Sequence, residues 1–146
     1  MKEFERIAHT ADLQIRAYGS TTKDLFRNAL RGMFHTIEPI SPLCRIENGQ
    51  VVCSEYDVER TVSLEAPDQE LLLIDFLSHA LYLSDIHNEA YVDVTIDSLS
   101  DTKLTATLKG VTITGFLGPE IKAVTFHDFS IKNKNGRWHA DIVFDI

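Results

Sequence analysis

The stretch PDQELLLIDFLSHALYLSD, residues 67–85, decides how the rest of the chain must fold. Pro67 suits the first position of a helix, where its missing N–H is not needed, and Glu70 complements the positive end of the helix dipole. Most residues from Leu71 to Leu83 are apolar, so polar side chains form only one narrow stripe: Asp68, Asp75, Ser78 and His79. A helix with so little polar surface must be buried on most sides. We therefore predict a core helix over about residues 67–84, too short and too often interrupted to span a membrane.

The remaining sequence predicts an α+β fold. A Thr-Thr-Lys-Asp segment resembles a helix capping box, and the apolar spacing after it predicts a first helix over about 21–35. Residues 11–18 alternate between apolar and polar side chains, as a strand does. The chain ends in a predicted hairpin of two strands, 121–132 and 137–146, joined by a turn that contains Asn135-Gly136. Helices do not alternate with single strands, so we expect two helices packed on an antiparallel or mixed sheet.

The composition is that of a soluble globular protein, with 44% hydrophobic and 25% charged residues. A length of 146 residues suits a single domain, 1–146, with a substantial core. The net charge of −8 argues against a large non-specific nucleic-acid surface, because phosphate binding needs Lys and Arg. We therefore expect no direct contact with nucleic acid and no contact with a membrane.

The two cysteines, Cys44 and Cys53, leave both a disulfide and free thiols open. Their count gives no disulfide framework, and their spacing matches no CxxC motif, which favours free thiols in a reducing compartment. The first residues, MKEFERIAHT, lack the apolar core of a signal peptide. The predicted location is therefore the cytoplasm.

Three segments carry residues that suit chemistry, and each also has an ordinary structural interpretation. In His9-Thr10-Ala11-Asp12 the polar side chains either satisfy a turn or form a site between two strands. Asp145 and the main-chain carboxylate of Ile146 are either a solvated chain end or a pair of hard oxygen ligands for Ca²⁺, Mg²⁺ or Mn²⁺. Lys122 and His127 either protect an edge strand from aggregation or belong to a site. No spacing of His and Cys suggests zinc.

Taken together, these segments resemble the archease family over nearly the whole chain and in the same order. The shared features are His9-Thr10-Ala11-Asp12, the leucine-rich helix with Tyr82-Leu83, the segment Lys122-Ala123-Val124-Thr125-Phe126-His127, and a terminal Asp145-Ile146. Two positions depart from the family pattern. Ala8 stands where an acidic residue is usual, which implies one carboxylate fewer at or near the site and a lower metal affinity. Phe126 stands where Tyr is usual, which removes a hydroxyl.

The resemblance implies a protein cofactor and not an enzyme. Archeases assist the RtcB-type RNA ligase of tRNA splicing, promoting its guanylylation and its multiple turnover. The family's metal site, for which Ca²⁺ is the expected ion, maps onto Asp12, Asp145 and the main-chain oxygen of Ile146. The family's functional lysine maps onto Lys122, and we expect His9 and His127 to lie near the partner.

Two other classes of function remain open from the residues themselves. A small metal-dependent phosphohydrolase could use the same carboxylates and lysine to activate water. It would need more ligands for a two-metal site, and no general base is evident. A chaperone-like protein-binding module is the other alternative, in which any metal would be structural or incidental.

Overall fold

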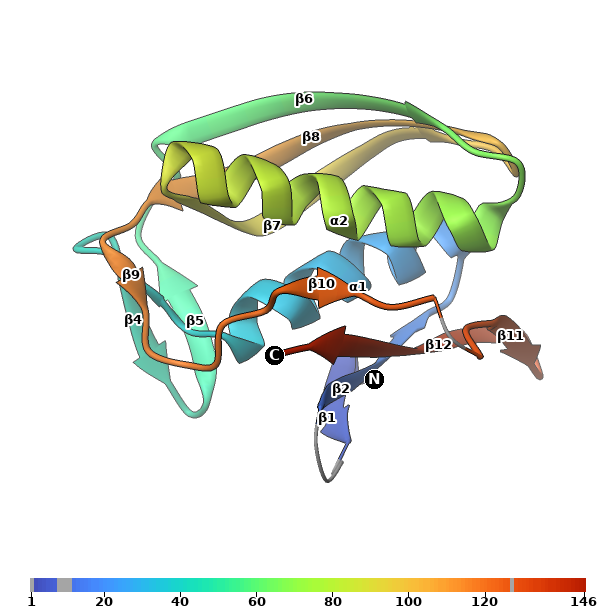
Figure 1. The fold of residues 1–146 in the computed structure, drawn as a ribbon, viewed down its shortest axis with the longest axis horizontal. Coiled ribbons are helices and arrows are strands. Elements are labelled where there is room, and N and C mark those ends of the chain that lie inside the picture. Colours follow the sequence, from blue (N-terminus) through green and yellow to red (C-terminus); the bar gives the residue numbers. More distant parts are fainter. Residues whose placement is uncertain (1, 8–11, 127) are drawn as a thin grey trace.

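Two antiparallel sheets enclose both helices in the computed structural model, which describes residues 2–7, 12–126 and 128–146 (Figure 1). The helices are α1 (Thr22–Thr36) and α2 (Gln69–His87). The strands are β1 (Phe4–Ile7), β2 (Leu13–Gly19), β3 (Pro39–Ile40), β4 (Cys44–Glu47), β5 (Gln50–Cys53), β6 (Val58–Glu65), β7 (Glu89–Leu99), β8 (Lys103–Thr112), β9 (Gly115–Phe116), β10 (Ala123–Val124), β11 (Ile131–Lys134) and β12 (Arg137–Asp145). This arrangement confirms the predicted α+β class.

The larger sheet has the order β1-β2-β12-β10, with β11 also pairing with β12, and the second sheet has the order β6-β8-β7. Two short ladders, β3-β9 and β4-β5, complete the pairing, and paired strands are antiparallel throughout the described part of the chain. Helix α1 contacts β2 on one side and β7 on the other, so it forms a middle layer between the sheets (Figure 1). Helix α2 lies in the same layer and contacts β7, β6 and β10.

The core follows from alternation in the strands and from the apolar faces of the helices. Leu13, Ile15 and Ala17 of β2 are fully or almost fully buried against α1, and Ala140, Ile142 and Phe144 of β12 are buried beside them. The predicted alternation is therefore confirmed for residues 13–18 and 137–145, while Ala11, where the first of these predictions began, lies outside the described residues. The side chains between these positions point to the other face of the sheet.

Helix α1 lies within one residue of its predicted range. Thr21 is its N-cap, and its side chain accepts a hydrogen bond from the backbone N–H of Asp24 at 3.1 Å. The predicted capping segment therefore starts the helix by satisfying one of the backbone donors at its N-terminus.

Helix α2 begins two residues later and ends three residues later than predicted. Asp68, rather than Pro67, forms the boundary, because its side chain accepts the backbone N–H of Leu71 at 2.8 Å as an N-cap. The helix continues to His87, and Asn88 ends it in the left-handed conformation with its N–H bonded to the carbonyl of Ser84. Its apolar face is buried as predicted, although Tyr82 remains 58% exposed. In the described part of the chain, no helix is long and apolar enough to cross a membrane.

The single strand predicted over 121–132 is wrong, because the segment forms two separate strands on the same neighbour. Strand β10 pairs with the end of β12, and β11 pairs with its beginning. Between them the chain turns, with the N–H of Phe129 bonded to the carbonyl of Phe126 and with Asp128 at a φ of 53°. The hairpin turn at Asn135-Gly136 is confirmed, since both residues have positive φ as a two-residue turn of this type requires.

The expectation of free thiols is also wrong: Cys44 and Cys53 form a disulfide. They are directly opposed in the β4-β5 hairpin, with their Cα atoms 4.0 Å apart. The signal was present in the sequence, because Asn48-Gly49 lies midway between the two cysteines. A hairpin centred on that turn brings Cys44 opposite Cys53. The cytoplasmic location stays a prediction.

Candidate functional site

The ends of three neighbouring strands meet at one end of the larger sheet. Leu13 pairs with Phe144, and Ala123 pairs with Asp145 on the other side of β12. Continuing each register by one residue places Asp12 opposite Asp145 and Lys122 opposite Ile146. The backbone N–H of Lys122 donates to the carbonyl of Asp145 at 2.7 Å. We call these four residues, Asp12, Lys122, Asp145 and Ile146, the strand-end cluster.

Alternation places both carboxylates of the strand-end cluster on the same face. Leu13 and Phe144 are buried and point toward α1, so Asp12 and Asp145 point to the outer face of the sheet. Asp145 is exposed and Asp12 is half-buried. Opposed residues in an antiparallel pair have Cβ atoms about 5 Å apart, which lets two carboxylates reach one cation. Two like charges at that separation repel unless a cation compensates them.

The donor set of the strand-end cluster fits a hard cation. Carboxylate and main-chain oxygens are the ligands that Ca²⁺ and Mg²⁺ take. Within residues 2–7, 12–126 and 128–146, no group of three or more His, Cys, Asp or Glu side chains could hold a metal ion. A cation at Asp12 and Asp145 would therefore keep water in most of its coordination shell. Ala8, His9 and His127 lie outside the described residues, so the roles of His9 and His127 stay predictions.

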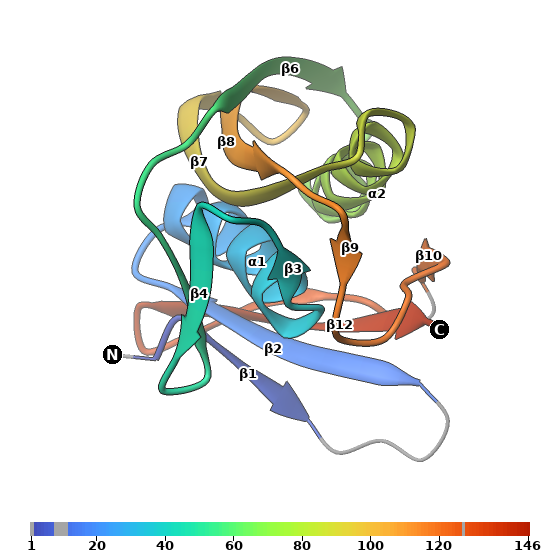
Figure 2. The ribbon, with the colours of Figure 1, turned by 90° about the vertical axis from the view of Figure 1, so that its left-hand side faces the viewer.

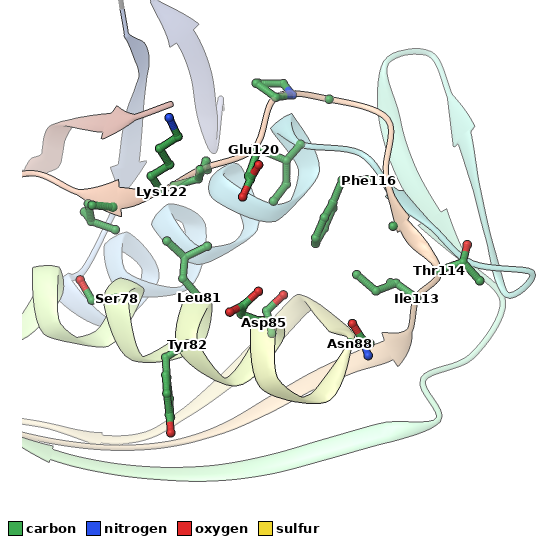
Figure 3. Close-up of a pocket in the computed structure, with 18 residues that line it drawn as sticks. Ser78, Leu81, Tyr82, Asp85, Asn88, Ile113, Thr114, Phe116, Glu120 and Lys122 are labelled. Carbon is green, nitrogen blue, oxygen red and sulfur yellow. The ribbon is translucent and has the colours of Figure 1, made fainter.

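A groove of about 820 Å³ runs beside the strand-end cluster, between the second half of α2 and residues 113–124 (Figure 3). Its apolar lining comes from both sides of the groove and includes Ile37, Leu81, Ile113, Phe116, Ile121 and Val124. Figure 3 shows Asp85 of α2 and Glu120 of the facing segment projecting toward the space between them. Lys122 lines one end of the groove, and its amino group points away from the groove. Lys122 therefore joins the groove to the strand-end cluster.

Sequence reasoning assigned Asp85 to a turn, and it included Glu120 in the candidate segment 120–127 without giving its side chain a role. Asp85 instead lies in the last turns of α2, on the side that faces the groove. The spacing of Ser78, Leu81 and Asp85 along the helix could have indicated that they share a face. For Glu120 no local signal existed, because its position depends on how the 113–124 segment crosses α2.

Comparison with known proteins gives one family. The model of the Archease protein family matches residues 4–146. The chain is 32% identical to the protein archease of Methanosarcina acetivorans, over 99% of this chain and 97% of that protein. It is also 32% identical to the protein archease of Pyrococcus furiosus, with both chains covered completely.

Solved structures agree with this result. The solution structure of protein 1598 from Methanobacterium thermoautotrophicum is 31% identical, covers both chains completely and superimposes with a TM-score of 0.75. A crystal structure from Thermotoga maritima, described as an archease and possible chaperone, covers 97% of this chain with a TM-score of 0.62. Its identity is 19%, so it supports the fold alone.

Proposed function

The chain belongs to the archease family, and from that membership we propose that it activates an RtcB-type RNA ligase as a protein cofactor. It would promote guanylylation and multiple turnover of the ligase, and would itself be an accessory protein and not an enzyme. The ligase is the proposed partner, and tRNA or other broken RNA is the substrate of the pair. The cytoplasm is the proposed location.

The observation that carries this proposal is the geometry of the strand-end cluster. Asp12 and Asp145 come from opposite ends of the chain, yet the register of β2 and β12 directs both to one face of the sheet. Lys122 is held beside them by its backbone bond to Asp145. A site with this composition presents carboxylates, a main-chain oxygen and an ammonium group at one exposed end of the molecule.

We propose a role for each residue of the strand-end cluster. Asp12 and Asp145 hold a divalent cation, with Ca²⁺ expected and Mg²⁺ or Mn²⁺ as alternatives, and Ile146 adds a main-chain oxygen. The bound cation would neutralise the paired carboxylates and attract anionic groups of the ligase or its nucleotide. Lys122 contacts a phosphate or a ligase carboxylate. Binding would favour the ligase conformation that takes up metal and nucleotide, which is a shift of an existing equilibrium.

A chaperone-like binding module is the second candidate, and the groove beside α2 is the observation that favours it. An open groove of about 820 Å³ with apolar side chains on both of its walls can receive side chains of another protein. The relative from Thermotoga maritima is described as a possible chaperone. Under this alternative the ligase would be bound without help from the carboxylates.

Multiple-turnover ligation by the cognate ligase tests the proposal. We expect the wild type to restore turnover, and Asp145→Ala to raise the Ca²⁺ concentration for half-maximal activation by about tenfold or more. Asp101→Ala is the matched control, because Asp101 is an exposed carboxylate in the turn between β7 and β8 of the other sheet. One extra residue after Ile146 should weaken activation while leaving the fold intact.

Full activation by both Asp145→Ala and the extended chain would refute the role of the strand-end cluster and favour the chaperone-like module. Nucleotide hydrolysis by the protein alone would instead favour the phosphohydrolase.

A further inference from the structure

The outer face of the larger sheet is open in the described part of the molecule. Helix α1 covers only the inner face, and no described helix or strand lies on the other side (Figures 1 and 2). The side chains on this open face follow from the pairing register. Across β11, β12 and β2, Lys132 is opposite His139 and His139 is opposite Tyr18, while Lys134 is opposite Arg137. All of these side chains therefore point away from the core.

Aromatic and basic groups are interleaved at this end of the sheet. The guanidinium carbon of Arg137 lies 3.9 Å from the centre of the Tyr18 ring, and the rings of Tyr18 and His139 are 6.5 Å apart. Lys132 and His139 are close enough to Asp141 to help lower the pKa of its carboxyl group, although the main cause is the hydrogen bond from Arg16. We call Tyr18, Lys132, Lys134, Arg137 and His139 the basic face.

The positive charge of the basic face is not neutralised within the described residues. Asp141 is already paired with Arg16, at 2.6 Å and 2.9 Å, and Glu5 accepts the hydroxyl of Tyr18 at 2.7 Å. Among residues 2–7, 12–126 and 128–146, no ion pair involves Lys132, Lys134 or Arg137. The Nε of Arg137 is also buried without a hydrogen-bond partner. In a chain with a net charge of −8, three unmatched cations on one face mark a local site for an anion.

We propose that the basic face binds single-stranded RNA. Exposed bases stack on aromatic rings and on guanidinium planes, while lysines contact the phosphates between them, and the basic face has both kinds of group. The carboxylates of an acidic peptide such as poly-glutamate would pair with the lysines and the guanidinium, but such a peptide has no aromatic ring to stack against Arg137 and His139. The choice of RNA over other polyanions rests on the proposed function, in which the ligase and its RNA substrate bind at the strand-end cluster of the same sheet.

The basic face and the strand-end cluster lie at opposite ends of the same strand. Asp145 lies six positions after His139 on β12, which corresponds to about 20 Å at the rise of an antiparallel strand. RNA held on the basic face would therefore lie about 20 Å from the strand-end cluster, close enough for one ligase to contact both. The protein would then hold part of the RNA substrate as well as activate the ligase.

Titration of a fluorescent single-stranded RNA of about 12 nucleotides with the full chain, without ligase, tests this proposal by anisotropy. With three phosphate contacts, the logarithm of the affinity should fall with the logarithm of the salt concentration at a slope of about −2, which is roughly an 18-fold loss between 50 and 200 mM salt. Lys132→Ala with Lys134→Ala should reduce the slope to about −0.7 and the loss to roughly threefold. Lys103→Ala with Lys109→Ala, on β8 of the other sheet, removes the same charge and should leave binding unchanged.

Arg137→Lys separates stacking from charge, because it keeps the cation and removes the plane over Tyr18. We expect this variant to keep the salt slope and to bind RNA several times more weakly. Inorganic polyphosphate and poly-glutamate serve as competitors without bases. If either competes as well as RNA for the wild type, or if the two-lysine variant binds RNA normally, the proposal is refuted.

Asp145→Ala distinguishes RNA binding from ligase activation. This variant should bind RNA like the wild type, because Asp145 is not part of the basic face. Loss of RNA binding in the two-lysine variant with normal ligase activation would leave both proposals standing as separate properties. These comparisons require that each variant unfolds at the same temperature as the wild type. We expect this for the two-lysine variant, because Lys132 and Lys134 are exposed and their substitution removes no core contact.

Discussion

Acidification should destabilise this protein through one buried histidine, His35 of α1. His35 is 6% exposed, and its Nδ1 accepts a hydrogen bond from the backbone N–H of Val51 at 3.3 Å. Its Nε2 lies 3.3 Å from the carbonyl of Val92, which that nitrogen can donate to. This pair of contacts requires the neutral ring with its proton on Nε2, because a protonated Nδ1 cannot accept from Val51. Protonation would thus remove the hydrogen bond between His35 of α1 and Val51 of β5.

The pKa of His35 is lowered to about 4, chiefly by burial and then by the positive charge of Arg31. Between that value and the ordinary value of about 6.5, the unfolded chain binds a proton that the folded chain does not. The stabilisation is therefore complete above about pH 6.5 and is lost as the pH falls toward about 4. From about pH 7 to about pH 4.5, this difference lowers the free energy of unfolding by about 2 kcal/mol.

Urea unfolding, followed by the fluorescence of the single Trp138, measures this effect at both pH values. Carboxylates also titrate in this range, so the readout is the difference between the wild type and His35→Gln, which has no titrating ring. His87→Gln, at the exposed end of α2, is the matched control and should follow the wild type. Parallel pH profiles for the wild type and His35→Gln would refute this reasoning.

Two further predictions concern stability. Reduction of the Cys44–Cys53 disulfide should lower the free energy of unfolding by about 2–3 kcal/mol, because it frees a loop of about ten residues in the unfolded chain. Urea unfolding with and without dithiothreitol measures this difference. A variant with Cys44→Ser and Cys53→Ser should not respond to the reductant. Gly110→Ala should destabilise by about 3 kcal/mol or more, since the added Cβ would lie 2.0 Å from the carbonyl oxygen of Ala90 on the neighbouring strand. Gly49→Ala is the control, because the added Cβ has nothing within 4 Å and only the backbone φ of 75° is unfavourable. An equal loss of unfolding free energy at both positions would show that contact with β7 is not the cause.

Local patterns in the sequence were sufficient for most of the secondary structure. The apolar content of residues 67–85 required burial on most sides, and α2 packs in the same layer as α1, against β7, β6 and β10. The alternation in residues 137–146 predicted which side chains of β12 are buried. The predicted helix boundaries were wrong where a single side chain sets the boundary. Asp68 caps α2 from just outside the helix, although the sequence pattern allows the same residue inside it.

The break between β10 and β11 shows a different limit. Residues 121–132 have a composition that suits one strand, and the turn near Asp128 interrupts it because β12 accepts the two pieces at separate positions. Pairing partners are distant in the chain, so no local window contains that information. The disulfide has a different explanation. The number and spacing of the cysteines favour free thiols, whereas the Asn48-Gly49 turn between them favours a hairpin that pairs them.

The sequence by itself determined the fold class, the family resemblance and the net charge of −8. Only the tertiary structure decided which charges share a surface. Asp12 and Asp145 face one way because Leu13 pairs with Phe144, and a shift of one residue would turn one of them toward the core. The same register gathers Lys132, Arg137 and His139 on the outer face of an acidic protein. Net charge is a sum over the chain, whereas binding depends on where strand pairing places each charge.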